Sequence, residues 1–220
     1  IRIYSEVRLG VLQGLIDRIN EAARNAERLE GLILNSPWLD LQGSAIVRTL
    51  GTPVIDRLGT RAPTSGIRLP DLGFNARALH ISLGGEWDYD LTLKSTPGPP
   101  IRAGWLRAIL LGHQRVAGGL RIGVPILVLA STTTDFSRRW HEGLRLVDTV
   151  LDVEQIAARA VRLGPHVTVV RIPEGLHDLM LSAPHVRKQA LDEIGRFVEA
   201  YVKRGPALLD GSVGGGVPTD

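Results

Sequence analysis

Residues 166–182 read HVTVVRIPEGLHDLMLS, and this stretch decides how the rest of the chain is interpreted. Its first seven residues are rich in β-branched side chains and stop at a Pro-Glu-Gly turn, a pattern that predicts a strand followed by a loop. His177 lies on that loop, and apolar residues at helical spacing follow over 186–201. Because reactive residues of open parallel sheets lie on loops beyond the carboxyl ends of strands, His177 is a candidate catalytic base.

The same alternation of strand and helix continues towards the N-terminus. Short apolar runs predict buried strands over 31–35 and 124–130, and apolar residues at helical spacing predict helices over 11–29 and 153–163. Strands that alternate with helices form a mostly parallel sheet that is covered by helices on both faces. The predicted fold class is therefore α/β.

Residues 40–120 interrupt this alternation, because Gly and Pro recur and the apolar runs are short. We interpret them as an inserted, mostly helical subdomain in which KSTPGPPIRAG (94–104) is a turn-rich connection. Its helical pieces are expected at 44–50, 52–59 and 103–120. The chain then divides into a helix and strand of core over 1–39, the insertion over 40–120, the C-terminal core over 121–204, and a Gly-rich, disordered tail over 205–220.

The composition is that of an ordinary globular protein. The chain has 220 residues, 44% of them hydrophobic and 22% charged, which is enough for one domain with a sizeable core. No apolar run reaches the length of about 18 residues that a membrane helix needs, so no integral membrane segment is expected. The opening IRIYSEVRLG lacks the apolar centre of a signal peptide. A cytoplasmic protein is the resulting expectation.

Charge and ligand chemistry exclude further classes of function. The formal net charge is only +3, and the arginines are scattered rather than clustered, so no nucleic-acid partner is expected. The chain has no cysteine, which rules out disulfides and thiolate metal sites. The remaining histidines do not pair at metal-ligand spacing, so we expect neither a metal nor another cofactor. These histidines are His80, His113, His141, His166 and His185.

Three aspartates follow the predicted strand 124–130, and each is a candidate partner for the histidine. The partner must accept a hydrogen bond from the imidazole and stabilise its charged form. Asp152-Val-Glu-Gln155 stands just before an apolar periodic run and has the pattern of a capping box, which predicts that Asp152 is a helix N-cap. Asp135 and Asp148 remain as alternatives.

Four separated stretches carry a resemblance to a known family. They are GLILNSPWLDL (31–41), GVPILVLAS (123–131), VDTVLDVEQIA (147–157) and LHDLMLS (176–182). In this order they resemble the α/β-hydrolase superfamily, and within it the serine aminopeptidase-type or monoacylglycerol-lipase-like (lysophospholipase) branch. The resemblance spans about residues 11–204 and implies an α/β-hydrolase-like sheet, with the inserted helical subdomain as its lid.

The resemblance also implies roles for the residues of the site. Catalytic groups of this fold follow one another as Ser, then Asp or Glu, then His, which makes His177 the base. The family context around Asp148 favours it as the acid over Asp135, although the alignment then requires an insertion, TTTDFSRRWHEGL (132–144). Asp178 is expected to help fix the loop of His177.

The nucleophile is not found in the sequence. The fold places it on a Gly-x-Ser-x-Gly turn between a strand and a helix, and no such motif occurs. Ser82, in HISLGG (80–85), is a poor candidate because no apolar strand precedes it. Ser36 follows a strand but is trapped before Pro37, and in the family this strand lies one step after the nucleophile. We therefore expect the nucleophilic serine upstream of this chain, and this chain alone to be inactive.

The resulting hypothesis is a serine hydrolase of carboxylic esters that acts through an acyl-enzyme, with a small-molecule ester or lipid-like substrate. Trp38, Trp87 and Trp105 flank the insertion or lie within it, and core packing is expected for each. A shortened sheet would expose an apolar strand edge, which favours a homo-oligomer. The alternative is a catalytically inactive hydrolase-like fragment that binds a small molecule or a partner protein.

Overall fold

The computed structural model describes residues 2–4, 29–41, 45–67, 72–94, 98 and 100–202. The predicted helix over 11–29, apart from its last residue, and the predicted tail over 205–220 lie outside these residues.

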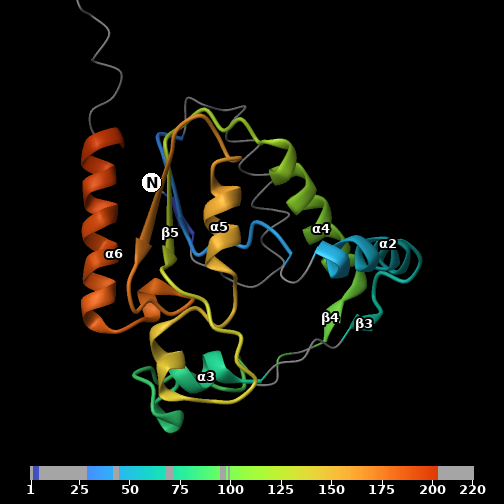
Figure 1. Ribbon diagram of the computed structural model, residues 1–220, viewed down its shortest axis with the longest axis horizontal. Coiled ribbons are helices and arrows are strands. Elements are labelled where there is room, and N and C mark those ends of the chain that lie inside the picture. Colours follow the sequence, from blue (N-terminus) through green and yellow to red (C-terminus); the bar gives the residue numbers. More distant parts are fainter. Residues whose placement is uncertain are drawn as a thin grey trace, which may run out of the picture.

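A parallel sheet forms the centre of the protein (Figure 1). Its strands lie in the order β1-β2-β5-β6, and every neighbouring pair is parallel. The strands are β1 (Arg2–Tyr4), β2 (Leu32–Asn35), β5 (Ile126–Ser131) and β6 (Val167–Ile172). The predicted strands at 31–35, 124–130 and 166–172 are thus confirmed, and the carboxyl ends of all of them meet at one edge of the sheet.

The central strands are buried because helices cover both faces of the sheet. All residues of β2 and β5 are buried, which explains why both read as continuous apolar runs rather than as alternating patterns. Burying one such Leu or Ile side chain contributes about 1.5–3 kcal/mol. The burial of these strands therefore stabilises the fold from the centre of the sheet.

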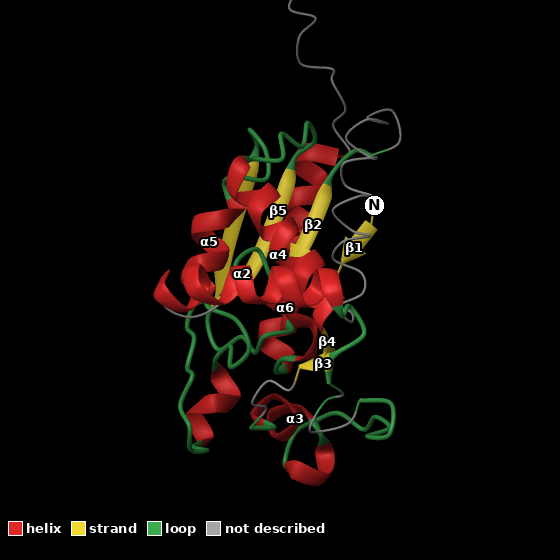
Figure 2. Cartoon of the chain, turned by 90° about the vertical axis from the view of Figure 1, so that its right-hand side faces the viewer, coloured by secondary structure: helices red, strands yellow, loops and turns green. Residues whose placement is uncertain are grey.

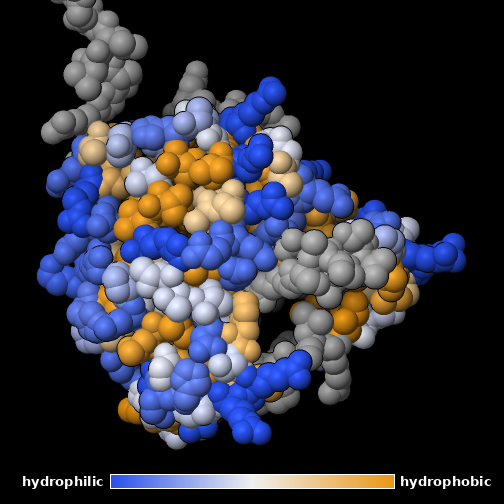
Figure 3. Space-filling model, viewed as in Figure 1, coloured by the Kyte–Doolittle hydropathy of each residue, from blue (hydrophilic) through white to orange (hydrophobic). Residues whose placement is uncertain are grey.

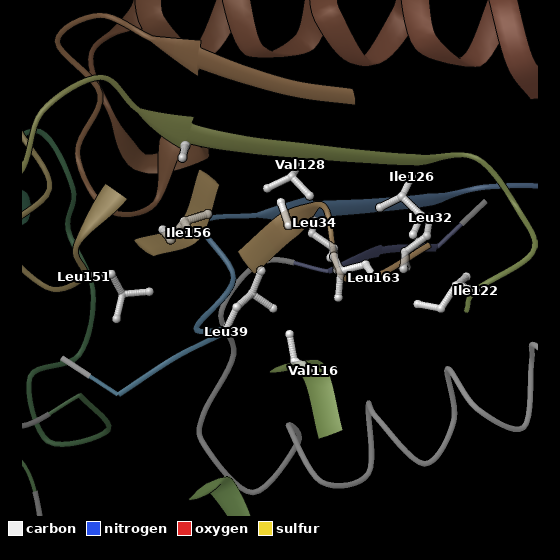
Figure 4. Close-up of a cluster of buried hydrophobic side chains, with 12 residues drawn as sticks. Leu32, Leu34, Leu39, Val116, Ile122, Ile126, Val128, Leu151, Ile156 and Leu163 are labelled. Atoms are coloured by element: carbon white, nitrogen blue, oxygen red, sulfur yellow. The ribbon is translucent and has the colours of Figure 1, made fainter. Parts of the chain in front are cut away.

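One face of the sheet packs against α5 (Val153–Ala160) and the C-terminal half of α4 (Ala103–Gly118), as Figure 4 shows. We call this packing the α4–α5 cluster, and its buried members are Leu32, Leu34, Leu39, Val116, Ile122, Ile126, Val128, Ala130, Leu151, Ile156, Ala160 and Leu163. α5 begins where predicted, because the Asp152 carboxylate accepts hydrogen bonds from the amides of Glu154 and Gln155. The predicted N-cap is confirmed.

The opposite face packs against α6 (Pro184–Phe197), which continues as a π-helical turn over Val198–Val202. Pro184 stands in the first turn of α6, where its missing amide hydrogen costs nothing. The buried members of this second cluster are Ile33, Leu127, Leu129, Ile172, Leu179, Val186, Ala190, Ile194 and Phe197. Alternate residues of β2 and β5 therefore supply opposite faces, as strand geometry requires.

The described part of residues 40–120 is mostly helical, and it contains a small antiparallel ribbon that the sequence did not indicate. Its helices are α2 (Ala45–Arg61), α3 (Phe74–Leu79), the 3-10 turn η2 (Ile81–Leu83) and the start of α4. The two predicted helical pieces 44–50 and 52–59 are one helix, which runs through Pro53. The ribbon pairs β3 (Gly66–Ile67) with β4 (Ile101–Arg102).

The insertion is not a separate unit in space. Figures 1 and 2 show α2 and the β3–β4 ribbon projecting beyond α4, while α3 lies below the carboxyl edge of the sheet. α4 joins the two regions, because Val116 near its end belongs to the α4–α5 cluster of the core. Figure 3 shows apolar residues scattered among hydrophilic ones over the face that carries α5. None of the described helices is long and apolar enough to span a membrane.

Candidate active site

The loops that follow β2, β5 and β6 meet at the carboxyl edge of the sheet. His177 lies on the loop after β6. Asp148 lies at the end of residues 132–148, a long segment after β5 that we call the excursion. His177 Nδ1 is 2.9 Å from Asp148 Oδ2. Both side chains are buried, with 5% and 0% of their surface exposed. The structure thus brings these two predicted residues together in an interior hydrogen bond.

The Asp148 carboxylate is held from its other side as well. Its Oδ1 accepts hydrogen bonds from the amides of Val150 at 2.7 Å and Leu151 at 2.8 Å. A carboxylate accepts hydrogen bonds, so Nδ1 of His177 is the donor and Nε2 is the nitrogen that can take up a proton. This is the arrangement in which an aspartate fixes the tautomer and orientation of a basic histidine.

The two ends of the excursion are hydrogen-bonded to each other, so the fold accommodates it without moving Asp148 away from the end of β5. The amide of Asp148 donates to the carbonyl of Thr133 at 2.9 Å, and the amide of Asp135 donates to the carbonyl of Asp148 at 3.1 Å. Thr134 joins the two ends again, since its hydroxyl donates to the carbonyl of Leu151 and accepts from the amide of Val153. The inserted residues therefore return to the position directly beyond β5.

Asp135 does not contact His177 in any hydrogen bond of the described structure. Its carboxylate pairs instead with His141 Nε2 at 3.1 Å, in a pair whose side chains are 30% and 51% exposed. It also accepts a 2.7 Å hydrogen bond from the amide of Ser137. The hydrogen bonds from Ser137 lower the pKa of Asp135, with a smaller contribution from His141.

A buried hydroxyl fixes the loop on both sides of His177. Ser182 Oγ accepts a hydrogen bond from the amide of Leu176 at 2.9 Å and donates one to the carbonyl of Asp178 at 3.1 Å. The loop begins with Glu174 in the left-handed region, at a φ of 59°. The sequence did not indicate this role of Ser182. Nothing in the local pattern shows that its hydroxyl bonds the amide of Leu176, six residues earlier.

Asn35, the last residue of β2, ties this loop to the sheet. Its Nδ2 donates to Asp178 Oδ1 at 2.7 Å, and its Oδ1 accepts from the amide of Leu179 at 3.3 Å. Asp178 also accepts from the amide of Met180 at 3.0 Å. The expectation that Asp178 helps to fix the loop is confirmed, while the part played by Asn35 was not foreseen.

The two serines considered as nucleophiles lie in other surroundings. Ser36 is fully buried and adopts a φ of 44°, and no described group bonds its Oγ. Ser82 lies in η2 after the helix α3, and its hydroxyl bonds His80 Nδ1 at 2.7 Å. Ser82 follows a helix rather than a strand, whereas Ser36 directly follows β2 and the next helix, α2, begins only at Ala45. β1 lies beside β2, in the sheet position next to the strand of Ser36, and residues 5–28 that follow it lie outside the described part.

Part of the insertion is fastened to the His177 loop. Trp87 Nε1 donates to the carbonyl of Leu181 at 2.7 Å, and its ring lies under the Arg187 guanidinium, 5.0 Å from the ring centre. Arg187 also pairs with Glu86 at 3.2 Å. The expected packing role is therefore observed for Trp87, together with a polar contact that the sequence did not indicate.

Arg145 fastens the same segment to the excursion beyond β5. Its guanidinium donates to the carbonyls of Arg77 and Leu83, each at 3.1 Å, and pairs with Glu142 at 2.8 Å. The guanidinium groups of Arg77 and Arg145 lie over the Trp140 ring, 4.3 and 5.0 Å from its centre. Residues 74–94 therefore form a fixed wall beside the candidate site. No group of three or more metal-ligating side chains occurs among the described residues.

Comparison with solved structures identifies the fold as that of the α/β-hydrolases. The monoacylglycerol lipase of Paleococcus ferrophilus superposes with a TM-score of 0.56 at 12% identity, over 87% of this chain and 74% of that chain. A soluble variant of the monoglyceride lipase of Saccharomyces cerevisiae, in complex with a substrate analogue, gives a TM-score of 0.53 at 9% identity, over 91% and 71% of the two chains. No protein-family model and no curated protein sequence matches.

Proposed function

We propose that the protein is a serine hydrolase of carboxylic esters in which His177 is the general base and Asp148 orients it. The observation that carries the proposal is the buried Asp148–His177 hydrogen bond at the carboxyl edge of a parallel sheet. The likeness of the fold to two lipases supports the same class of reaction, although one fold hosts many chemistries. The nucleophile in this proposal is a serine upstream of Ile1.

The chemistry follows from the atoms that the structure positions. Nε2 of His177 takes the proton of the serine hydroxyl as its oxygen attacks the ester carbonyl, and Asp148 stabilises the imidazolium that forms. Nε2 then gives the proton to the departing alcohol, which leaves an acyl-serine. Water repeats the two proton transfers and releases the carboxylic acid. Backbone donors for the oxyanion would be needed as well.

A lipid-like acyl group is the substrate that we propose, on the strength of the two similar structures and the apolar wall. The wall packs Ala78 and Leu79 against Leu176, the residue before His177. Trp87, Tyr89 and Trp140 lie against the same apolar group. An acyl chain bound near the reactive atoms would rest on this surface.

Labelling with a fluorophosphonate probe tests the proposal. The chain should remain unlabelled, whereas the reading frame extended upstream of Ile1 should label at a single serine and hydrolyse a p-nitrophenyl ester. His177→Ala in the extended protein should abolish both, and the exposed His141→Ala should change neither. Labelling of the chain at one of its own serines, such as Ser5 after β1, would show that the nucleophile was misplaced.

A second candidate is a protein with this fold that binds a small molecule or a partner without catalysis. The absence of Gly-x-Ser-x-Gly from the sequence favours it. An extended reading frame that contains neither this motif nor a labelled serine, while the protein still folds, would support this candidate over the hydrolase.

A further inference from the structure

One edge of the central sheet has backbone hydrogen-bonding groups that no described residue occupies. β6 is the last strand of the sheet and pairs there only with β5. The carbonyls of His166 and Ile172 face β5, since they accept bonds from amides at its two ends at 3.0 and 3.2 Å. Backbone groups of successive strand residues point to opposite sides, so every second residue faces β5. The amides and carbonyls of Val167, Val169 and Arg171 therefore point away from the sheet.

This edge lacks the features that usually protect an edge strand, which are a proline, a lysine or a bulge. β6 reads VTVVRI and keeps a continuous register with β5. Its one charged side chain, Arg171, is turned onto α5, where it pairs with Glu154 at 2.7 Å. Figure 1 shows β6 as the orange arrow beside α6, and Figure 3, in the same view, shows apolar residues between α5 and α6. The edge is therefore suited to pairing with another strand.

The helix α5 presents a surface beside this edge whose two ends carry opposite charge. Glu154, Ala158 and Val161 follow one another at helical spacing, so they share one side of the helix, and all three are exposed. The pair between Glu154 and Arg171 turns this side towards β6. Arg162, which is also exposed, stands at the opposite end from Glu154. The surface is thus acidic at its start, apolar in the middle and basic at its end.

We propose that a second copy of this chain pairs with β6, antiparallel and about a two-fold axis at Val169, so that the two sheets become one. In this register Val169 lies opposite Val169 of the second copy, and Val167 lies opposite Arg171 of the second copy. All of these residues have outward backbone groups, so each opposed pair exchanges both of its hydrogen bonds. The edge is therefore complementary to itself, as a two-fold interface requires.

The charges on α5 favour a second copy over an unrelated strand. The two-fold axis makes the two α5 helices antiparallel, which brings Glu154 of one copy towards Arg162 of the other. The small side chain of Ala158 lies between these charges and lets the helices approach. The inference does not rest on the proposed function, because none of these residues belongs to the Asp148–His177 pair.

Light scattering after size-exclusion chromatography, over a range of protein concentrations, tests the proposal on the 220-residue chain. The wild type should form a reversible dimer of twice 23.9 kDa. Val169→Pro removes an amide that points outward and keeps every bond to β5, so the variant should fold while its dimer dissociation constant rises at least about tenfold. Val169→Ile, the matched control that keeps the amide, should change the constant less than about threefold.

Charge reversal on α5 tests the antiparallel arrangement. Arg162→Glu should raise the dimer dissociation constant about threefold or more, because Glu154 of the second copy then faces a like charge. Adding Glu154→Arg to the same chain should restore the dimer, since opposite charges face each other again. A double variant weaker than Arg162→Glu alone would contradict the arrangement.

Cross-linking decides the question even if Val169→Pro does not fold. The sequence contains no cysteine, so one introduced cysteine reports on one position. Directly opposed residues of a hydrogen-bonded antiparallel pair lie about 5.5 Å apart between Cα atoms, a distance that a disulfide spans. Val169→Cys should therefore form a covalent dimer on mild oxidation. Leu93→Cys, at a more exposed position outside the sheet, should remain largely monomeric.

Three results would overturn the proposal: a monomeric wild-type chain, a dimer that Val169→Pro leaves intact, or equal cross-linking of the two cysteine variants. The second result would assign the association to another surface, such as the sheet edge at β1. None of these measurements uses ester hydrolysis, so their failure leaves the proposed function untouched. A dimer that depends on Val169 in a protein without esterase activity would support this inference alone.

Discussion

Asp148–His177 and Asp135–His141 are two aspartate–histidine pairs with nearly equal distances, 2.9 and 3.1 Å, and both aspartates belong to the excursion beyond β5. The first pair is buried to 5% exposure or less, and two backbone amides hold its carboxylate. The second is 30–51% exposed, so water and salt screen it. A short contact alone therefore does not distinguish a candidate catalytic pair, whereas burial with a fixed carboxylate does.

The largest difference between the pairs should appear when each histidine is removed. In a form of the protein that hydrolyses p-nitrophenyl esters, His177→Ala should lower kcat by about 10³-fold or more, as for other members of a catalytic triad. His141→Ala should leave kcat within about twofold. Comparable losses in the two variants would remove the functional distinction between the pairs.

Replacing the aspartates sharpens the comparison. Asp148→Asn should lower kcat by about 10²–10⁴-fold, because an amide no longer fixes the tautomer of the histidine or stabilises its charge. Asp135→Asn should change kcat by less than about threefold. Steady-state kinetics with circular dichroism spectra of each variant would check this. A dead Asp135→Asn with an active Asp148→Asn would show that the acid has been assigned to the wrong residue.

His113 shows what burial does to a histidine without a carboxylate partner. Its pKa is lowered to about 4 in the folded protein, mainly by desolvation, against about 6.5 in the unfolded chain. The unfolded state therefore binds more protons between these values, so stability falls as the pH falls from about 6.5 to about 4. Over this pH range the free energy of unfolding falls by about 3 kcal/mol in total.

Urea unfolding at several pH values would measure this slope. His113→Phe should flatten the dependence between pH 6.5 and 4, while His141→Phe, at an exposed position, should leave it unchanged. Asp40 and Arg159 face His113 and contribute to the same field, so Asp40→Asn serves as a further comparison. An unaltered slope in His113→Phe would mean that other groups cause the acid sensitivity.

Replacing Ser182 tests whether the loop that carries His177, and not only the Asp148–His177 pair, is needed for activity. Ser182→Ala removes the hydroxyl that bonds the amide of Leu176 and the carbonyl of Asp178, and it should cost about 1–3 kcal/mol of folding free energy because a buried amide loses its partner. It should also lower kcat about tenfold, since His177 loses support on both sides. Ser137→Ala, in the Asp135 loop, should change neither measurement.

The smallest effect is expected at Asp152, which caps α5 and belongs to neither aspartate–histidine pair. Asp152→Ala removes the N-cap of α5 and should cost about 0.5–2 kcal/mol, with kcat nearly unchanged. Thermal melting and ester hydrolysis on the same samples would separate the two effects. A large loss of kcat without a loss of stability would assign Asp152 a direct part in the site.

The pattern of the sequence was sufficient for three strands of the sheet, β2, β5 and β6, and for the loop position of His177, but it did not indicate β1. Continuous apolar runs identified β2 and β5, and helical spacing identified α4, α5 and α6, because burial of these surfaces dominates local conformation. It did not indicate the β3–β4 ribbon, since strands of two residues leave no periodicity to read. It also divided α2 into two pieces at Gly51, whereas the helix runs without a break from Ala45 to Arg61.

What the sequence by itself determined is the succession β2, α4, β5, α5, β6 and α6, the loop position of His177 and the capping role of Asp152, because these depend on residues that are neighbours in the chain. Between Asp135 and Asp148 the local pattern left both open. Only the tertiary structure places Asp148 against His177, through the Thr133 and Thr134 contacts that return the excursion to the end of β5. Asn35 likewise bonds Asp178, 143 residues further along the chain, and Ser182 bonds the amide of Leu176, 6 residues earlier. Contacts of this kind form only when the strands pair, and no periodicity along the chain encodes them.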